Sequence, residues 1–207
     1  AIRRKNMGEA ALLSLFFEGG QRLAVTQPPN SPIDAVSYRD WTAWIAENNL
    51  PIEFDAGKKS DFADLVAESE SILTTSVAEG FGMAFLEPWT VGKPLWGRRL
   101  ADVCADFEAC GVRLDWLYDR LDIPLDWVDR DRFSACWHAA VSAAAQRFGH
   151  HLEEDRLGDA FDRLTADGRV DFGVLNEALQ RQILSRLVVD PTARKNLSGI
   201  NPWLSSP

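Results

Sequence analysis

The arrangement that most restricts the fold is an alternation of short apolar or β-branched runs with helical patterns over roughly the first half of the chain. Gly, Pro or Asn bounds these segments, as is typical of successive βα units. Because such units place their strands side by side in one direction, the pattern predicts an α/β fold with a Rossmann-like parallel sheet flanked by helices. The expected strands are 22–26, 52–56, 71–77 and 94–97, and the expected helices are 6–18, a segment opened by a capping box of Ser37 and Asp40, 61–67 and 82–91.

These strands are too few for a typical parallel sheet, so we expect at least one more. The opening run AIRRKN has the character of a strand that leads into a helix. The further strand is therefore expected at or just before Ala1. A chain that begins with Ala also suggests an excised fragment, so we expect any partner domain to lie upstream.

After Leu100 the strand signals stop, and two one-sided apolar helical patterns follow. One lies within 133–144 and the other within 173–189, and neither apolar face can remain in water. We therefore expect a Rossmann-like region over residues 1–100 and a C-terminal all-helical extension over residues 101–207. The extension is expected to pack on the Rossmann-like region or on a missing N-terminal domain.

Composition excludes several classes of protein. The formal net charge of −9 argues against a nonspecific nucleic-acid or anionic-membrane binder, which needs a basic excess. Cys104, Cys110 and Cys136 form no CxxC pair and predict neither a disulfide framework nor a metal site. No apolar run approaches the roughly 20 residues of a transmembrane helix, and no signal-peptide core is visible. We therefore expect a soluble, cytoplasmic protein, and the oligomeric state stays open.

The stretch EGFGMAFLE contains the candidate site. The strand over 71–77 leads to Glu79 at the carboxyl edge of the sheet, where open α/β sheets bind ligands. Gly80 and Gly82 allow unusual backbone dihedrals, and the following helix directs the N–H groups of Phe81, Gly82 and Met83 at the same place. This geometry predicts an anion site, for which a diphosphate is the natural occupant.

The two acids of this stretch have two possible readings. Glu79 can flank the anion, where it meets sugar hydroxyls or positive charge that develops on a sugar ring, while Glu87 accepts hydrogen bonds from other hydroxyls. In the plainer reading, Glu79 favours the helix dipole and Glu87 is solvated. The apolar neighbours of Glu87 favour the first reading.

The run EGFGMAFLEPWTVGKPLWG, residues 79–97, resembles the donor-site signature of the retaining GT-B glycosyltransferases of family 4. That signature has two glutamates separated by seven residues, followed by Gly-Lys-Pro, and Glu79 and Glu87 have this spacing. The resemblance covers about residues 2–100 in order and is specific over 71–97.

The resemblance implies one half of a GT-B fold that binds a nucleoside-diphosphate sugar as donor substrate. It implies that Glu79 faces the reacting carbon as the catalytic carboxylate and that Glu87 binds the ribose. Lys5 matches the lysine that neutralises the diphosphate, and backbone amides of the glycine turn complete the site. Retention of anomeric configuration, independence from a metal and other cofactors, and inactivity without an upstream acceptor domain are also implied.

Three departures from the family pattern accompany these matches. The partner arginine of Lys5 usually lies about five residues earlier, which is upstream of Ala1, so Arg3 or Arg4 is a substitute candidate. Pro88-Trp89 replaces small residues, and the region after Leu100 follows no pattern of the family.

Two other classes stay open at this stage. The same fold can serve as a noncatalytic nucleotide-binding, phosphate-binding or protein-interaction module. A flavodoxin-like or other phosphate-binding enzyme would instead hold flavin or free phosphate in the turn.

Overall fold

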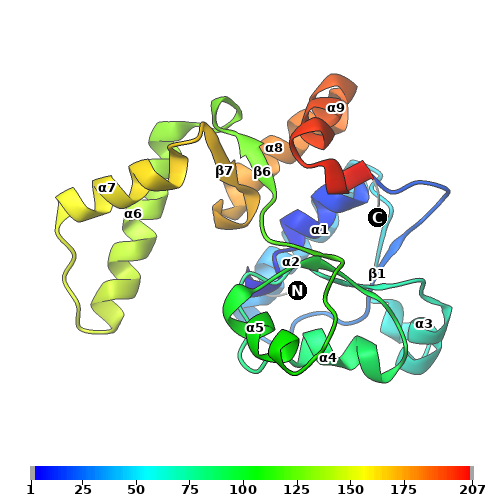
Figure 1. Ribbon diagram of the computed structural model, residues 1–207. Coiled ribbons are helices and arrows are strands. Elements are labelled where there is room, and N and C mark those ends of the chain that lie inside the picture. The colour runs from blue at the N-terminus through cyan, green and yellow to red at the C-terminus, as the bar shows by residue number, and fades with distance from the viewer. Residues whose placement is uncertain (1–2, 206–207) are drawn as a thin grey trace. The chain divides into compact units, whose positions relative to one another are not determined.

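The computed structural model describes residues 3–205 as two compact units (Figure 1). Unit 1 contains the described residues up to Arg120 together with Pro202–Ser205, and unit 2 contains Leu121–Asn201. The expected strand position at Ala1 lies outside the described residues. Among residues 3–205, no helix combines the length and apolar character needed to cross a bilayer.

Unit 1 has two parallel sheets. The first pairs β1 (Leu23–Val25) with β2 (Ile52–Phe54), and the second has the order β3-β4-β5. The strands of the second sheet are β3 (Ile72–Thr74), β4 (Leu95–Arg98) and β5 (Leu117–Tyr118). The mixed α/β class with parallel sheets flanked by helices is thereby confirmed.

The helices of unit 1 alternate with these strands, as expected for βα units. They are α1 (Met7–Ser14), α2 (Pro32–Glu47), α3 (Phe62–Glu68), α4 (Met83–Thr90) and α5 (Ala101–Ala109), with 3₁₀ turns η1 (Arg3–Lys5), η2 (Ala56–Lys58) and η5 (Pro202–Ser205).

The expected start of α2 at Ser37 is wrong. Ser31 caps the helix by accepting a hydrogen bond from the Asp34 backbone N–H, and Pro32 occupies the first turn, where its missing N–H costs nothing.

The second sheet buries both of its faces. On one face, α4 and α5 contribute to a core that contains Phe85, Leu95, Cys104 and Leu114. On the other face lies α1, all of whose residues are buried.

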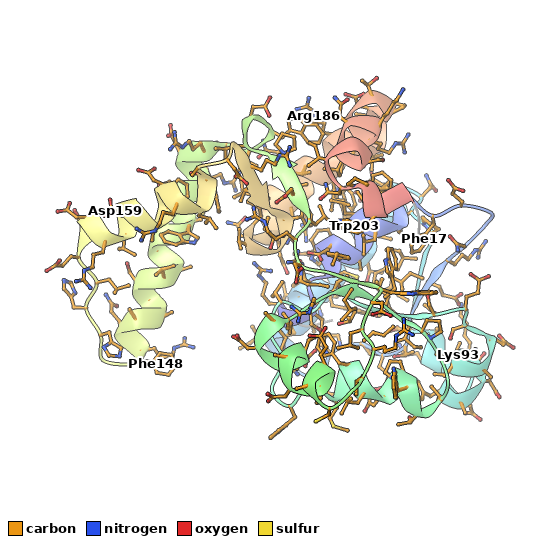
Figure 2. All side chains as sticks on the ribbon, viewed as in Figure 1. Phe17, Lys93, Phe148, Asp159, Arg186 and Trp203 are labelled. Atoms are coloured by element: carbon orange, nitrogen blue, oxygen red, sulfur yellow. The ribbon has the colours of Figure 1, made fainter. Side chains whose placement is uncertain are left out.

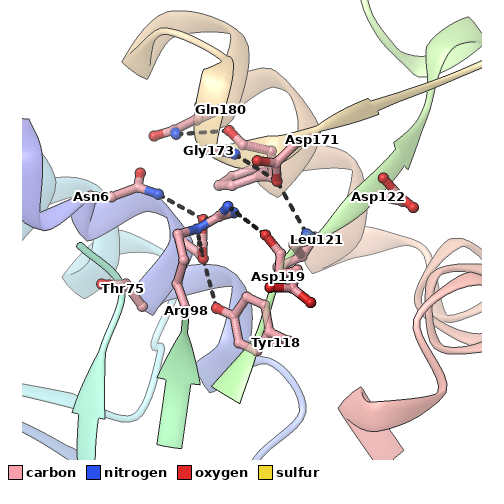
Figure 3. A network of polar contacts seen from close by, with 12 residues as sticks. Asn6, Thr75, Arg98, Tyr118, Asp119, Leu121, Asp122, Asp171, Gly173 and Gln180 are labelled. Carbon is pink, nitrogen blue, oxygen red and sulfur yellow. Dashed lines mark hydrogen bonds and ion pairs between the residues drawn. The ribbon is translucent and has the colours of Figure 1, made fainter. Parts of the chain in front are cut away.

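A polar network crosses the α1 face (Figure 3). The carboxylate of Glu9 is fully buried and accepts hydrogen bonds from Arg98 at 2.7 and 2.8 Å, from the Tyr118 hydroxyl at 2.6 Å and from the Asn6 amide at 2.7 Å. Four donor contacts on one carboxylate supply the compensation that a buried charge requires. Trp203 stacks on the Tyr118 ring at 3.8 Å between centroids, which fastens η5 to β5.

Unit 2 corrects the expectation of an all-helical extension. Its strands β6 (Asp122–Pro124) and β7 (Arg169–Asp171) form an antiparallel pair. Its helices are α6 (Arg130–Arg147), α7 (Glu154–Thr165), α8 (Glu177–Val189) and α9 (Pro191–Ile200), with 3₁₀ turns η3 (Leu125–Trp127) and η4 (Phe172–Val174). Strands of two or three residues are too short to produce a periodic sequence signal, so the pattern around them reads as helical.

The structure also shows a repeat that the sequence does not reveal. In each half of unit 2, a strand leads into a 3₁₀ turn and then into a helix capped by an Asp or Asn side chain. Asp129 accepts from the backbone N–H of Arg132 at the start of α6, and Asn176 accepts from that of Leu179 at the start of α8. The two halves share an N-cap side chain that accepts a backbone hydrogen bond, rather than identical residues.

Residues 101–120, which the sequence assigned to the helical extension, belong to unit 1. The reason is that α5 packs in the core of the second sheet and β5 pairs with β4.

Gly97 is predicted to be indispensable to the second sheet. It has φ of +131°, and a Cβ atom there would lie 1.9 Å from the carbonyl oxygen of Thr74 on the paired strand. We expect Gly97→Ala to lower the free energy of unfolding by more than about 1 kcal/mol, measured by urea denaturation. Gly111→Ala is the matched control, because Gly111 also has positive φ, +88°, but has no neighbour within 4 Å of the added Cβ. Equal losses in both variants would contradict the steric explanation.

Candidate functional site

A charged cluster lies beyond the carboxyl end of β3. Glu79 accepts hydrogen bonds from the ammonium of Lys5, from the Ser76 hydroxyl at 2.7 Å and from Arg4 Nη1 at 3.3 Å. The Glu79 side chain is 9% exposed, whereas Arg4 and Lys5 are 47% and 39% exposed. The structure thus brings together three of the residues that the sequence assigned to the site, with both cations still accessible from solvent.

Backbone contacts fix the two cations beside this loop. The Val77 N–H donates to the carbonyl of Arg4 at 2.8 Å, and the Thr75 hydroxyl donates to the carbonyl of Lys5 at 2.8 Å. Asn6 follows with φ of 49°, a left-handed conformation that Asn tolerates, and α1 begins after it. The backbone of Lys5 is therefore held in place by these hydrogen bonds and by the start of α1.

The charges of the cluster act on the ionisation of Glu79. Partial burial alone would raise the pKa of Glu79, but the hydrogen bonds from Lys5 and Ser76 and the charges of Lys5 and Arg4 together hold that pKa below its ordinary value. Glu79 is therefore an ionised carboxylate at neutral pH, in contact with the cationic side chains of Lys5 and Arg4.

The glycine turn leads from this cluster into α4. Gly82 caps the helix with φ of +70° and has no side chain that could satisfy the amides of the first turn. Among residues 3–205, no protein acceptor is bonded to the N–H groups of Phe81, Gly82 or Met83. These amides can therefore donate to a bound anion, and the anion site itself stays a prediction.

The two glycines of the turn differ in what they require. At Gly82 a Cβ atom would approach Val103 to 2.3 Å, so packing against α5 and the positive φ both demand glycine. Gly80 does not have a positive φ, so the unusual dihedrals that glycine allows are used at Gly82 and not at Gly80. Nothing lies within 4 Å of a Cβ built on Gly80, which leaves the approach to the turn open.

Glu87 lies on the exposed face of α4. It follows Met83 by four residues, so both side chains lie on the same side of the helix, one turn apart. Phe85 and Pro88 face the core instead. The apolar neighbours of Glu87 therefore do not exclude it from solvent, and their support for the binding role is lost.

Two cavities in unit 1 lie away from these residues. One of about 520 Å³ is lined by Trp96, Trp116, Tyr118 and Trp203 among others, and one of about 590 Å³ lies between β1 and β3. Figure 2 labels Phe17, which borders the second cavity, and Trp203, which borders the first. Neither is lined by Glu79, by the glycine turn or by Glu87, so the candidate site is an open surface site on a sheet edge.

Sequence reasoning missed Ser76 and Glu9. Ser76 donates a hydrogen bond to Glu79, and its signal was the polar run Thr74-Thr75-Ser76, which begins at the last residue of β3. Glu9 anchors α1, and its signal was a carboxylate in an otherwise apolar helix. No group of three or more His, Cys, Asp and Glu side chains that could hold a metal occurs within the described residues.

Comparison with known proteins supports a glycosyltransferase relationship. The chain is 28% identical over 187 residues to the mannosylglucosyl-3-phosphoglycerate synthase of Petrotoga mobilis. The match covers 87% of this chain but 35% of that protein, so the chain spans about a third of the length of the curated relative. No family model matches the chain, and no solved structure matches it.

The lowered pKa of Glu79 predicts an acid-sensitive contribution to stability. Because the folded state holds this proton less tightly than the unfolded state, the contribution is complete above the ordinary pKa of 4.5 and is lost as the pH falls through the folded value. We expect the free energy of unfolding of the wild type to fall more steeply below about pH 4.5 than that of Glu79→Gln, in urea titrations at a series of pH values.

Lys5→Met is the control for this titration. It keeps the Glu79 carboxylate but removes the ammonium that lowers its pKa, so its acid sensitivity should lie between those of the wild type and Glu79→Gln. Parallel curves for all three proteins would show that Glu79 has no linkage to folding.

Proposed function

We propose that this chain is the donor-binding part of a retaining glycosyltransferase of the GT-B class, with a nucleoside-diphosphate sugar as its donor. The observation that carries the proposal is the meeting of Glu79 with Lys5 and Arg4 at the carboxyl edge of β3, beside the open amides of α4. The similarity to a glycosyltransferase supports the general reaction class.

In this proposal the diphosphate lies on the amides of Phe81 to Met83. Lys5 and Arg4 reach it from the other side, since an ammonium carries three N–H donors and a guanidinium carries five, and Glu79 uses only some of them. When the bond between the anomeric carbon and the phosphate oxygen breaks, negative charge develops on the leaving diphosphate. The cations and amides stabilise that charge without requiring a divalent metal.

Glu79 acts on the other fragment of the donor. Positive charge develops on the sugar ring as the leaving group departs, and an ionised carboxylate beside the ring stabilises it. The acceptor hydroxyl then forms the new bond to the anomeric carbon and gives its proton to the phosphate oxygen of the leaving diphosphate. The charges of Lys5 and Arg4 help to lower the pKa of Glu79 and so favour its ionised form. The cations that bind the diphosphate therefore also support the carboxylate that lies beside the sugar.

Glu87 is proposed to bind the ribose. Its position on the exposed face of α4, one turn after Met83, allows the nucleoside to lie along the helix while the diphosphate occupies the helix start. A carboxylate accepts hydrogen bonds from two neighbouring hydroxyls. The acceptor site and the transfer reaction belong in this proposal to the longer protein, so the present chain binds donor and does not transfer sugar alone.

Titration calorimetry with UDP, GDP and ADP tests the assignment. We expect one of these nucleotides to bind the chain, and Lys5→Met and Glu87→Ala each to weaken that binding about tenfold or more. The reason is that a hydrogen bond to a charged group contributes about 1.5–3 kcal/mol, and 1.4 kcal/mol corresponds to a factor of ten.

Glu47→Ala is the matched control, because Glu47 is an exposed glutamate near the end of α2 and far in sequence from the site. It should bind as the wild type does. If Glu87→Ala retains full affinity for every nucleotide, the ribose role is wrong. If Lys5→Met retains it, the diphosphate site is wrong.

A further inference from the structure

The cavity of about 520 Å³ in unit 1 lies along β5, the outer strand of the second sheet. Residues 115–120, which contain β5, form much of its lining, and Trp96 of β4 and Trp203 of η5 complete it. All of these lining residues belong to unit 1. Neither Glu79 nor Glu87 lines the cavity, so it is separate from the proposed donor site.

Aromatic rings form a large part of this lining. Three of the eight tryptophans of the chain border the cavity, together with Tyr118. Trp116 is 55% exposed, which makes a broad ring surface available to a ligand. Trp203 lies almost flat on Tyr118, with 11° between the two ring planes. This stack fixes the orientation of two rings that border the cavity, so the cavity has an ordered aromatic wall.

Two carboxylates border the same cavity at opposite ends of β5. Asp115 precedes β5 and Asp119 follows it, and their side chains are 56% and 75% exposed. Asp115 Oδ2 accepts hydrogen bonds from Arg113 at 2.5 and 2.9 Å, and Asp119 Oδ1 accepts one from Arg99 at 3.4 Å. Within residues 3–205, the second oxygen of each carboxylate accepts no hydrogen bond. These oxygens can accept from hydroxyl groups of a ligand.

The balance of charge in the cavity favours an uncharged ligand. Because Arg113 and Arg99 compensate the two carboxylates, and Arg120 also borders the cavity, neither sign is in strong excess. An anion would meet the carboxylates, and a cation would meet the arginines. A neutral ligand that bears several hydroxyls avoids both costs and uses the aromatic wall and the acceptor oxygens together.

We propose that this cavity is a second saccharide-binding site, which holds a neutral sugar chain apart from the donor site. One face of a pyranose ring presents C–H groups, which pack on the electron-rich face of an aromatic ring. Hydroxyls at the edge of the sugar ring then donate to Asp115 and Asp119. The volume of about 520 Å³ lies in the usual range of small-molecule sites, roughly 300–1,000 Å³. The inference does not rest on the proposed function.

NMR titration of the chain with maltotriose and with cellotriose tests the site, because the two probes differ in the geometry of their linkage. The readout is the indole N–H signals of the tryptophans. We expect saturable shifts at Trp116 and Trp203 and none at Trp41, which is 1% exposed. Choline chloride is the cationic control and should shift none of these signals.

Trp116→Ala and Asp115→Ala test the aromatic and the polar contact separately, and both side chains are exposed. We expect each variant to weaken saccharide binding about fivefold or more, through loss of one ring face or one acceptor. Nucleotide affinity and the midpoint of thermal unfolding should stay unchanged. Trp89→Ala is the matched control, because Trp89 is 53% exposed but lies on α4 outside the cavity lining. It should bind saccharide as the wild type does.

The absence of shifts with both trisaccharides would overturn the proposal, and so would shifts with choline that match those with saccharide. Saccharide binding that is lost in Lys5→Met and retained in Trp116→Ala would place the sugar at the donor site instead. Shifts at Trp116 and Trp203 that appear with rising protein concentration alone would assign the cavity to a second copy of the chain. Each of these two results would also overturn the proposal.

Discussion

The buried carboxylate of Glu9 is the contact on which the organisation of unit 1 depends. It joins α1 to β4 through Arg98 and to β5 through Tyr118. A buried ion pair adds little net stability, but removing one partner leaves an uncompensated charge at a cost of about 3–5 kcal/mol. The network therefore fixes the position of α1 on the sheet. The residues that precede α1, including Lys5, are positioned with it.

This placement has an electrostatic consequence at the sheet edge. Lys5 and Arg4 both approach Glu79, so two cations face one carboxylate and leave an excess of positive charge next to the open amides of α4. The protein as a whole has a formal charge of −9. A local positive site on an acidic surface selects the place at which an anionic ligand can bind, so the net charge of the chain does not conflict with the proposed diphosphate site.

Local signals made the parallel sheet and the glycine turn predictable from sequence, whereas only the resemblance to a known family assigned Lys5 to the same site as Glu79. What escaped prediction depends on contacts between distant residues. The Glu9 network joins residues about 90 to 110 positions apart, and β6 and β7 are held by pairing and caps rather than by periodicity. The exposure of Glu87 was misjudged because apolar neighbours in sequence, such as Phe85 and Pro88, face the other side of α4.

The central claim is that the amides after Gly80 and the cations beside Glu79 bind a nucleoside diphosphate. A crystal structure of the chain with the nucleotide that binds in solution tests this most directly. The account predicts that a phosphate oxygen lies within hydrogen-bonding distance of the Phe81 to Met83 amides and of Lys5, with the ribose against Glu87. A nucleotide bound in one of the two cavities of unit 1, with the glycine turn empty, would contradict it.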